Sequence, residues 1–100
     1  MISPVRSAKY LKFVRGQRCA FCARPATEAH HTGRLVGGGG VGIKPCDMLV
    51  APLCGEHHRE LHKTGGIKRN GEPLTGSEVA ADLWQAIALT LRAYHIQETA

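Results

Sequence analysis

The sequence predicts a small α+β fold, and three observations lead to this class. Short apolar segments bounded by glycine and proline alternate with segments of helical periodicity, which indicates a few strands mixed with helices. A capping-box pattern close to the C-terminus predicts one long helix. Three of the four cysteines and three of the six histidines stand in pairs at metal-ligand spacings, whereas aromatic residues make up only 5% of the 100 residues. A chain of this size has a marginal core, so a metal would help to fix it. We expect a single domain over residues 1–100.

The first expected element is a short N-terminal helix within residues 3–14. Ser7 is a suitable N-cap and Gly16 ends the segment, and an apolar stripe is formed by Tyr10, Leu11 and Val14. The remaining faces carry basic residues, which are Lys9, Lys12, Arg15 and Arg18. Such charges usually serve solvation, and contact with phosphate groups is the alternative.

A C-x-x-C pair, Cys19-Ala-Phe-Cys22, follows this helix. Redox proteins of the thioredoxin type use the same spacing, but no βαβ pattern surrounds it here. A matching half-site, Cys54-x-x-His57, lies downstream, so the four side chains predict a structural zinc site. Cys46 has no partner at ligand spacing, and we interpret it as a small buried or loop residue.

Two short strands are expected next, over residues 27–32 and 48–53. On a strand the adjacent His30 and His31 would point to opposite faces, so one could serve a metal while the other has a different role. In the second strand Pro52 requires an edge or terminal position.

Between these strands, residues 33–42 contain six glycines and cannot form regular secondary structure. Such a segment suits close approach to phosphates, although a plain linker is about equally consistent with the composition. Arg34 and Lys44 stand at its two ends and favour phosphate contact. The segment lacks the Gly-Lys-Ser/Thr ending of a nucleotide-binding P-loop.

The segment Cys54–His62 is expected to enter a helix over residues 55–63, which Gly65 and Gly66 end. His58 and His62 are four residues apart and therefore lie one turn apart on the same face. Adjacent residues on a helix point about 100° apart, so His57 and His58 should serve two different metal sites. Glu60 stands one position too late for the H-E-x-x-H motif of zinc proteases.

The C-terminal part is expected to contain turns over residues 64–76, with exposed bases at Lys68 and Arg69, and then one long helix. The capping box Thr75-Gly-Ser-Glu78 opens this helix, which should extend over about residues 76–95. Its apolar stripe indicates core packing or a partner-binding face.

Charge is distributed unevenly along the chain. The formal net charge is +5, with +8 in residues 1–70 and −3 in the remaining thirty. The basic part of the chain also contains the candidate metal ligands. This coincidence indicates a polyanion near the metal, although a surface that serves only solubility would also account for the charge. No apolar run is long enough to span a membrane and no signal-peptide pattern is present, so we expect a cytoplasmic protein without a membrane partner.

Together, a His-His pair on a strand, a glycine-rich segment, a second short strand and a helix with H-x-x-x-H resemble the HNH endonucleases of the ββα-metal fold. The C-x-x-C pair and Leu53-Cys54-Gly-Glu-His57-His58 are similar to the elements of its zinc-knuckle branch, with His57 where a cysteine is common. The run Gly-Val-Gly-Ile-Lys-Pro-Cys-Asp, residues 40–47, looks like phage and prophage members. The resemblance covers about residues 3–63, with a motif core at 17–64.

The resemblance implies a role for each motif residue. His31 matches the general base that takes a proton from the attacking water, and an imidazole suits this role near neutral pH. His30, His58 and His62 match the ligands of a catalytic divalent ion, which could be Mg, Mn, Zn or Ni. Asp47 stands near the middle motif residue, although it is Asp where Asn is usual, and Lys44 could neutralise the scissile phosphate. DNA contact is expected from Arg34, Lys44, Lys68 and Arg69.

A metal-dependent DNA endonuclease is therefore the leading hypothesis. The alternatives are a zinc-stapled nucleic-acid-binding module without turnover, and an interaction domain that uses the C-terminal helix. A protein partner that delivers the substrate is compatible with all three, and the sequence does not indicate the oligomeric state.

Overall fold

A computed structural model describes residues 6–32 and 46–100, and its elements confirm the α+β class. They occur in the order α1 (Ala8–Arg15), β1 (Glu28–His31), β2 (Val50–Leu53), α3 (Gly55–Thr64), β3 (Lys68–Arg69), β4 (Glu72–Pro73) and α4 (Gly76–Thr99). The described strands form two antiparallel pairs, β1–β2 and β3–β4. The expectations for Arg34, Lys44 and the glycine-rich segment lie outside the described residues.

Helix α1 begins and ends where the sequence predicts. The Ser7 hydroxyl accepts a hydrogen bond from the Tyr10 amide at 3.1 Å, which satisfies one of the donors left unpaired at a helix start. At the other end the Gly16 amide donates to the carbonyls of Phe13 and Val14. Tyr10 and Val14 are buried, so α1 packs through this stripe while its remaining faces stay open to solvent.

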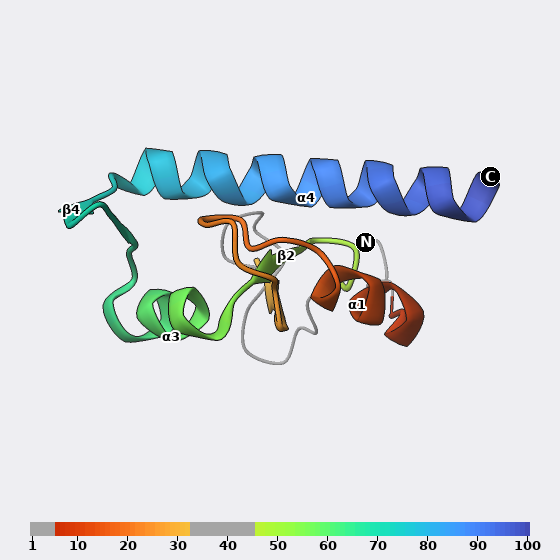
Figure 1. Cartoon of the computed structure of the whole chain (residues 1–100), viewed down its shortest axis with the longest axis horizontal. Helices are drawn as coiled ribbons and strands as arrows, with labels where there is room; N and C mark the ends of the chain where they lie inside the picture. The colour runs from red at the N-terminus through yellow and green to blue at the C-terminus, as the bar shows by residue number, and fades with distance from the viewer. Residues whose placement is uncertain (1–5, 33–45) are drawn as a thin grey trace.

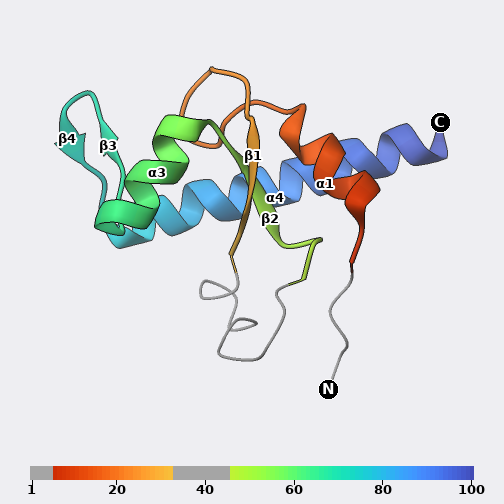
Figure 2. The ribbon, with the colours of Figure 1, turned by 90° about the horizontal axis from the view of Figure 1, so that it is seen from below.

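The β1–β2 pair forms the centre of the molecule (Figure 2). Its register sets Glu28 opposite Leu53 and His31 opposite Val50. All four residues of β2 are buried, whereas those of β1 are half-buried. Helices α1 and α4 contact β2, and α3 contacts β1. The Pro52 carbonyl accepts from the Ala20 amide at 2.8 Å, on the side away from β1, and the Pro52 nitrogen faces the same side, so Pro52 costs no ladder hydrogen bond.

Thr32 closes the open end of this strand pair. Its amide donates to the Leu49 carbonyl at 3.2 Å and its hydroxyl donates to the same oxygen at 2.6 Å. Thr32 itself is buried. These bonds join the residue that follows β1 to the residue that precedes β2, and we call the pair the neck.

The main core packs α4 against β2 and the C-x-x-C segment. Phe21, Leu53, Leu83 and Ile87 are its larger members, and two cysteines, Cys19 and Cys54, belong to the same buried cluster. A second cluster joins α1 to the far part of α4 through Tyr10, Val14 and Val50. The Tyr10 ring lies 4.9 Å from the Tyr94 ring in an edge-to-face arrangement.

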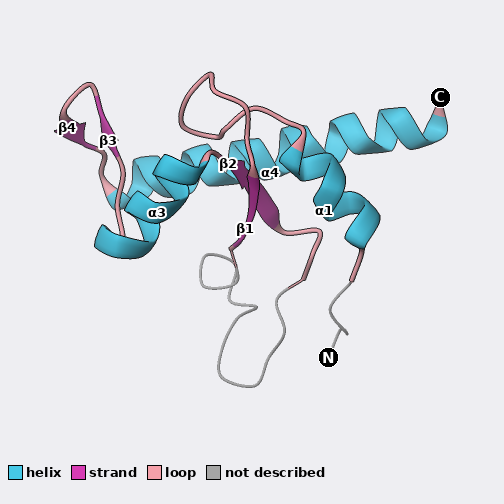
Figure 3. Ribbon diagram, turned by 60° about the horizontal axis from the view of Figure 1, so that its bottom comes forward, coloured by secondary structure: helices cyan, strands magenta, loops and turns pink. Residues whose placement is uncertain are grey.

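A β-hairpin occupies part of the segment that the sequence analysis describes only as turns. β3 and β4 pair through Lys68 with Pro73 and Arg69 with Glu72. The two residues between them have positive φ, 53° at Asn70 and 82° at Gly71, which is the type I′ turn favoured by Asn-Gly. The hairpin lies beyond α3, at the end of the molecule opposite the C-terminus (Figure 3).

Helix α4 runs along the length of the molecule (Figure 1). It begins at the predicted capping box, in which the Thr75 hydroxyl accepts from the Glu78 amide and the Glu78 carboxylate accepts from the Thr75 amide. It ends at Thr99, so the predicted end near residue 95 is too early. No breaker follows Tyr94, and Lys9 holds Glu98 at 2.7 Å, which supports the additional turn. No helix in the described ranges combines the length and apolar character needed to cross a membrane.

Candidate metal centres and the His31–Asp47 pair

Four predicted zinc ligands come together where the C-x-x-C segment meets the start of α3. The potential ligand atoms of Cys19, Cys22, Cys54 and His57 all lie within 4.8 Å of one another. His57 Nδ1 is 3.5 Å from Cys19 Sγ and 3.4 Å from Cys54 Sγ, and Cys22 Sγ is 3.9 Å from Cys54 Sγ. We call this group the cysteine cluster.

These separations suit one tetrahedral ion. With Zn–S near 2.3 Å and Zn–N near 2.1 Å, the edges of a tetrahedron are about 3.8 Å for S···S and about 3.6 Å for S···N. The Phe21 amide also points at Cys19 Sγ at 3.5 Å, a donor that favours a thiolate. The cysteine cluster could therefore bind a metal such as zinc.

The two cysteines of the C-x-x-C pair differ in their electrostatic environment. Burial raises the pKa of the Cys19 thiol. Burial acts in the same direction on Cys22, but hydrogen bonds from the backbone and side chain of Arg24 outweigh it and the pKa of Cys22 is lowered. Arg24 is itself held by Glu56 at 2.8 Å. A cation beside a three-thiolate site offsets part of its negative charge.

A second group, the histidine cluster, consists of His30 on β1 with His58 and His62 on α3. Their potential ligand nitrogens lie within 4.8 Å of one another. The His30 ring centroid is 5.2 Å from that of His58 and 5.6 Å from that of His62. The Nε2 atoms of His58 and His62 are 3.0 Å apart. Two nitrogens on one ion at about 2.1 Å would be about 3.0 to 3.4 Å apart, so these residues fit a shared ion.

Glu28, for which the sequence predicts no role, fixes one nitrogen of this cluster. Its Oε1 lies 3.0 Å from His58 Nδ1. A carboxylate there accepts the Nδ1–H and leaves the Nε2 lone pair directed at His62, as in carboxylate–histidine–metal arrangements. A Cβ at Gly55 would lie 3.2 Å from Glu28 Oε2, so the glycine leaves space for this carboxylate. The sequence pattern does place Glu28 near the cluster, because it stands two residues before His30 and therefore on the same face of the strand.

His30 is half-buried beside the two histidines of α3. Burial, followed by the nearby charges of His58 and His62, lowers the pKa of His30 to about 4. A neutral imidazole is the form that binds metal ions. Its environment therefore keeps His30 in the ligand-competent form at neutral pH.

His31 points away from the histidine cluster and meets Asp47. The distance from His31 Nε2 to Asp47 Oδ1 is 2.9 Å. The Asp47 side chain is 3% exposed, and its Oδ2 accepts a hydrogen bond from the Ser7 amide at 2.8 Å. Burial alone would raise the pKa of Asp47, but bonds from His31 and Ser7 and the charge of Arg6 lower it. A buried anion thus orients the His31 ring.

The other predicted contact residues are placed as follows. Lys68 and Arg69 are exposed on the β3–β4 hairpin, and Arg69 is paired with Asp82 at 2.6 Å. Cys46 is half-buried in the loop before β2 and lies outside both clusters. Within the described residues, the structure therefore brings together both predicted ligand sets and the His31–Asp47 pair.

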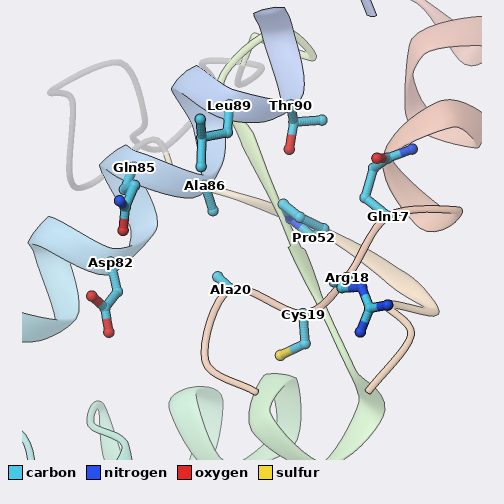
Figure 4. A pocket seen from close by; sticks show the side chains of 10 residues that line it. All are labelled: Gln17, Arg18, Cys19, Ala20, Pro52, Asp82, Gln85, Ala86, Leu89 and Thr90. Atoms are coloured by element: carbon cyan, nitrogen blue, oxygen red, sulfur yellow. The ribbon is translucent and has the colours of Figure 1, made fainter. Parts of the chain in front are cut away.

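A cavity of about 370 Å³ lies between α4 and the loop around Cys19 (Figure 4). Gln17, Pro52 and Leu89 are among the residues that line it. The three residues of the histidine cluster do not line this cavity, and neither do His31 and Asp47. The candidate chemistry thus lies on the partly open surface formed by β1 and α3, away from the cavity.

Taken together, the α+β fold and the cysteine cluster define the chain as a candidate metal-binding protein. Residues 3–77 match the family described as "Protein of unknown function (DUF968)", and the chain belongs to this family. It is 48% identical over 56 residues to the "Uncharacterized protein YdfU" of Escherichia coli (strain K12). That alignment covers 54% of this chain but only 15% of the relative. No solved structure matches the chain.

Proposed function

We propose that this protein is a metal-dependent DNA endonuclease with the ββα-metal core of the HNH type. The observation that carries the proposal is the arrangement around β1, where consecutive residues serve two sites. His30 faces the histidine cluster, while His31 faces the buried Asp47 carboxylate. The order β1, β2, α3 corresponds to the ββα order of that fold.

The histidine cluster offers three nitrogens and a partly open side. His30 and His58 are half-buried and His62 is exposed, so a bound ion would keep positions for other ligands. An ion there supplies positive charge that stabilises a phosphate undergoing hydrolysis. Glu28 contributes by holding His58 in the tautomer that presents Nε2.

His31 acts in this proposal as the general base. Its Nε2–H is donated to Asp47, so Nδ1 carries the lone pair that accepts a proton from the attacking water. The Asp47 carboxylate stabilises the imidazolium that forms and holds the ring in one orientation. Substrate contact is assigned to the basic part of the chain, including Lys68 and the flanking residues Arg34 and Lys44.

A plasmid-nicking assay tests the proposal directly. Purified protein should convert supercoiled plasmid to nicked or linear DNA in the presence of one of Mg²⁺, Mn²⁺, Zn²⁺ or Ni²⁺, and EDTA should stop the reaction. His62→Ala should lose the activity, because it removes a ligand on the exposed side of the cluster without entering the core. Absence of cleavage with all four ions would reject the nuclease.

A zinc-stapled nucleic-acid-binding module is the second candidate, and one observation favours it. The cysteine cluster provides four donors and is the more completely enclosed of the two groups. It would stabilise a DNA-binding fold with no contribution from the histidine cluster. DNA binding that persists in the absence of cleavage under every ion would support this candidate.

A further inference from the structure

The solvent-facing side of α1 and the turn that follows it form an exposed basic surface. Five bases follow one another at every third position, and all of them are exposed: Arg6, Lys9, Lys12, Arg15 and Arg18. Helix α1 contains no acidic residue. Surfaces that serve only solubility usually intersperse both signs, so this distribution indicates an anionic partner.

Intramolecular ion pairs neutralise only part of this surface. Lys9 is held by Glu98 at 2.7 Å and Arg6 lies 3.3 Å from Asp47. Among the described residues no carboxylate pairs with Lys12, Arg15 or Arg18. Arg18 donates only to the Ala23 carbonyl, at 3.2 Å. These three bases therefore remain available to a ligand.

The basic surface begins at the His31–Asp47 pair. The amide of Ser7, the N-cap residue of α1, donates to Asp47 Oδ2 at 2.8 Å. From there α1 runs beside the β1–β2 pair (Figure 2). Residues three apart advance about 4.5 Å along a helix, and phosphates of one DNA strand follow at about 3.4 Å along the duplex axis. Long basic side chains at this spacing can reach successive phosphates.

We propose that Lys12, Arg15 and Arg18 bind the phosphate backbone of duplex DNA beside the position at which a strand would be cleaved. The inference rests on the proposed function for the identity of the polyanion and for the position of the cleaved bond. It adds a flanking contact surface on α1 to the bases expected on the hairpin and on the connection between the strands. Contacts of this kind position the duplex and carry no sequence information.

The test measures affinity for a fluorescent 30-base-pair duplex between 50 and 300 mM salt with the full chain. Lys12→Gln/Arg15→Gln should reduce the slope of log K against log salt by about 1.8, which corresponds to about 30-fold weaker binding at 0.15 M salt. Arg92→Glu changes net charge by the same amount on the exposed side of α4. This control should keep the slope of the wild type.

Arg18→Gln provides a second variant that lies outside α1 and cannot act through the stability of the helix. It should reduce the slope by about 0.9 and the affinity by about fivefold at 0.15 M salt. Equal slopes for the wild type and these variants would overturn the inference, whether or not the protein cleaves DNA. Tighter binding to an RNA duplex of the same sequence would overturn the choice of DNA.

The outcome separates this inference from the proposed function. Suppose that the wild type binds DNA with a salt slope that depends on Lys12 and Arg15, but that none of the four ions supports cleavage. This result would support DNA binding by the basic surface and reject the nuclease. If the wild type cleaves DNA and the variants bind DNA as tightly as the wild type, the nuclease is supported and the role of the basic surface in DNA binding is rejected. A wild type without measurable DNA binding rejects both.

Discussion

The cysteine cluster and the histidine cluster take ligands from the same helix but differ in donor type, number and exposure. In the first, Cys19 and Cys54 are 6% and 5% exposed and belong to the hydrophobic core. In the second, two half-buried imidazoles and one exposed imidazole face the outside of the strand pair. Four enclosed donors are typical of structural metal sites, whereas three donors with an open side are typical of catalytic sites.

The difference originates in two consecutive residues. His57 and His58 stand next to each other at the start of α3, where adjacent side chains diverge by about 100°. His57 turns toward Cys19 and Cys54, and His58 turns toward Glu28. One short helix therefore connects the buried part of the molecule to its open face, and changes on either side should have separable effects.

The largest effect is expected when the cysteine cluster is broken. Cys22→Ser should prevent stable folding, because structural zinc contributes an apparent ~10 to 16 kcal/mol, comparable with the whole stability of a small domain. Circular dichroism and zinc analysis measure this. Cys46→Ser, outside both clusters, is the matched control and should fold with its zinc. A well-folded Cys22→Ser protein with the zinc content of the wild type would contradict the assignment.

On the open side, His31→Ala should abolish cleavage while metal content and fold remain. Loss of a general base typically lowers the rate by about 10² to 10⁴. His30→Ala in the same series should lose activity together with the ion of the histidine cluster. If His31→Ala loses metal and His30→Ala retains it, the two roles are exchanged. Full cleavage activity in both variants would contradict the proposed nuclease function.

A smaller effect is expected from Glu28, which acts through His58. In Glu28→Gln a neutral amide replaces the carboxylate, so the Nδ1–H is held less firmly and the Nε2 lone pair is presented less often. Loss of such a partner typically lowers metal affinity by about 10- to 100-fold. Titration with Ni²⁺ or Zn²⁺ measures it, with Glu72→Gln on the exposed hairpin as the control. Unchanged affinity would mean that Glu28 only packs against α3.

The last effect concerns the pH dependence of stability and tests the shielding of His30. The pKa of His30 is lowered to about 4 from an ordinary 6.5, so between these values the unfolded chain binds more protons than the folded one. The free energy of unfolding should therefore fall as pH decreases from about 6.5 to 4. An ion on the histidine cluster acts in the same direction, because its ligands must be deprotonated.

Urea unfolding between pH 7 and 4.5 measures this dependence. His30→Gln should flatten it, whereas His95→Gln, near the end of α4, should leave it unchanged. Asp47 acts in a different window: its lowered pKa contributes stability that is lost only below about pH 4. A His30→Gln protein with the pH dependence of the wild type would contradict the shielding of His30.

The elements that the sequence predicts are those with a local physical signal. Ser7 and Thr75 have capping hydroxyls, Gly65 adopts the left-handed conformation with φ 75°, and each defines a helix end where expected. The alternation of a strand also predicts that His30 and His31 face apart. The cysteine cluster follows from the spacing of its two half-sites, and the pair of His58 and His62 follows from spacing on a helix, whereas only the resemblance to the HNH endonucleases adds His30 to that pair.

What the sequence does not indicate depends on contacts between distant segments. The pairing of Glu28 with His58 requires the register of β1 against α3, and the final turn of α4 is held by Lys9 from the first helix. The alternation of a strand places Glu28 on the same face as His30, but no local pattern indicates that Glu28 meets His58 or that Lys9 meets Glu98. The hairpin is a different case, because Asn70-Gly71 is a strong local signal for a type I′ turn.

The neck formed by Thr32 and Leu49 has a consequence for how the protein can vary. Both hydrogen bonds at the neck lie outside the connection between the strands, and so do the seven residues of the two clusters. Substitutions between Thr32 and Cys46 therefore change neither the neck nor a ligand, and their effects on DNA binding can be measured with both clusters intact.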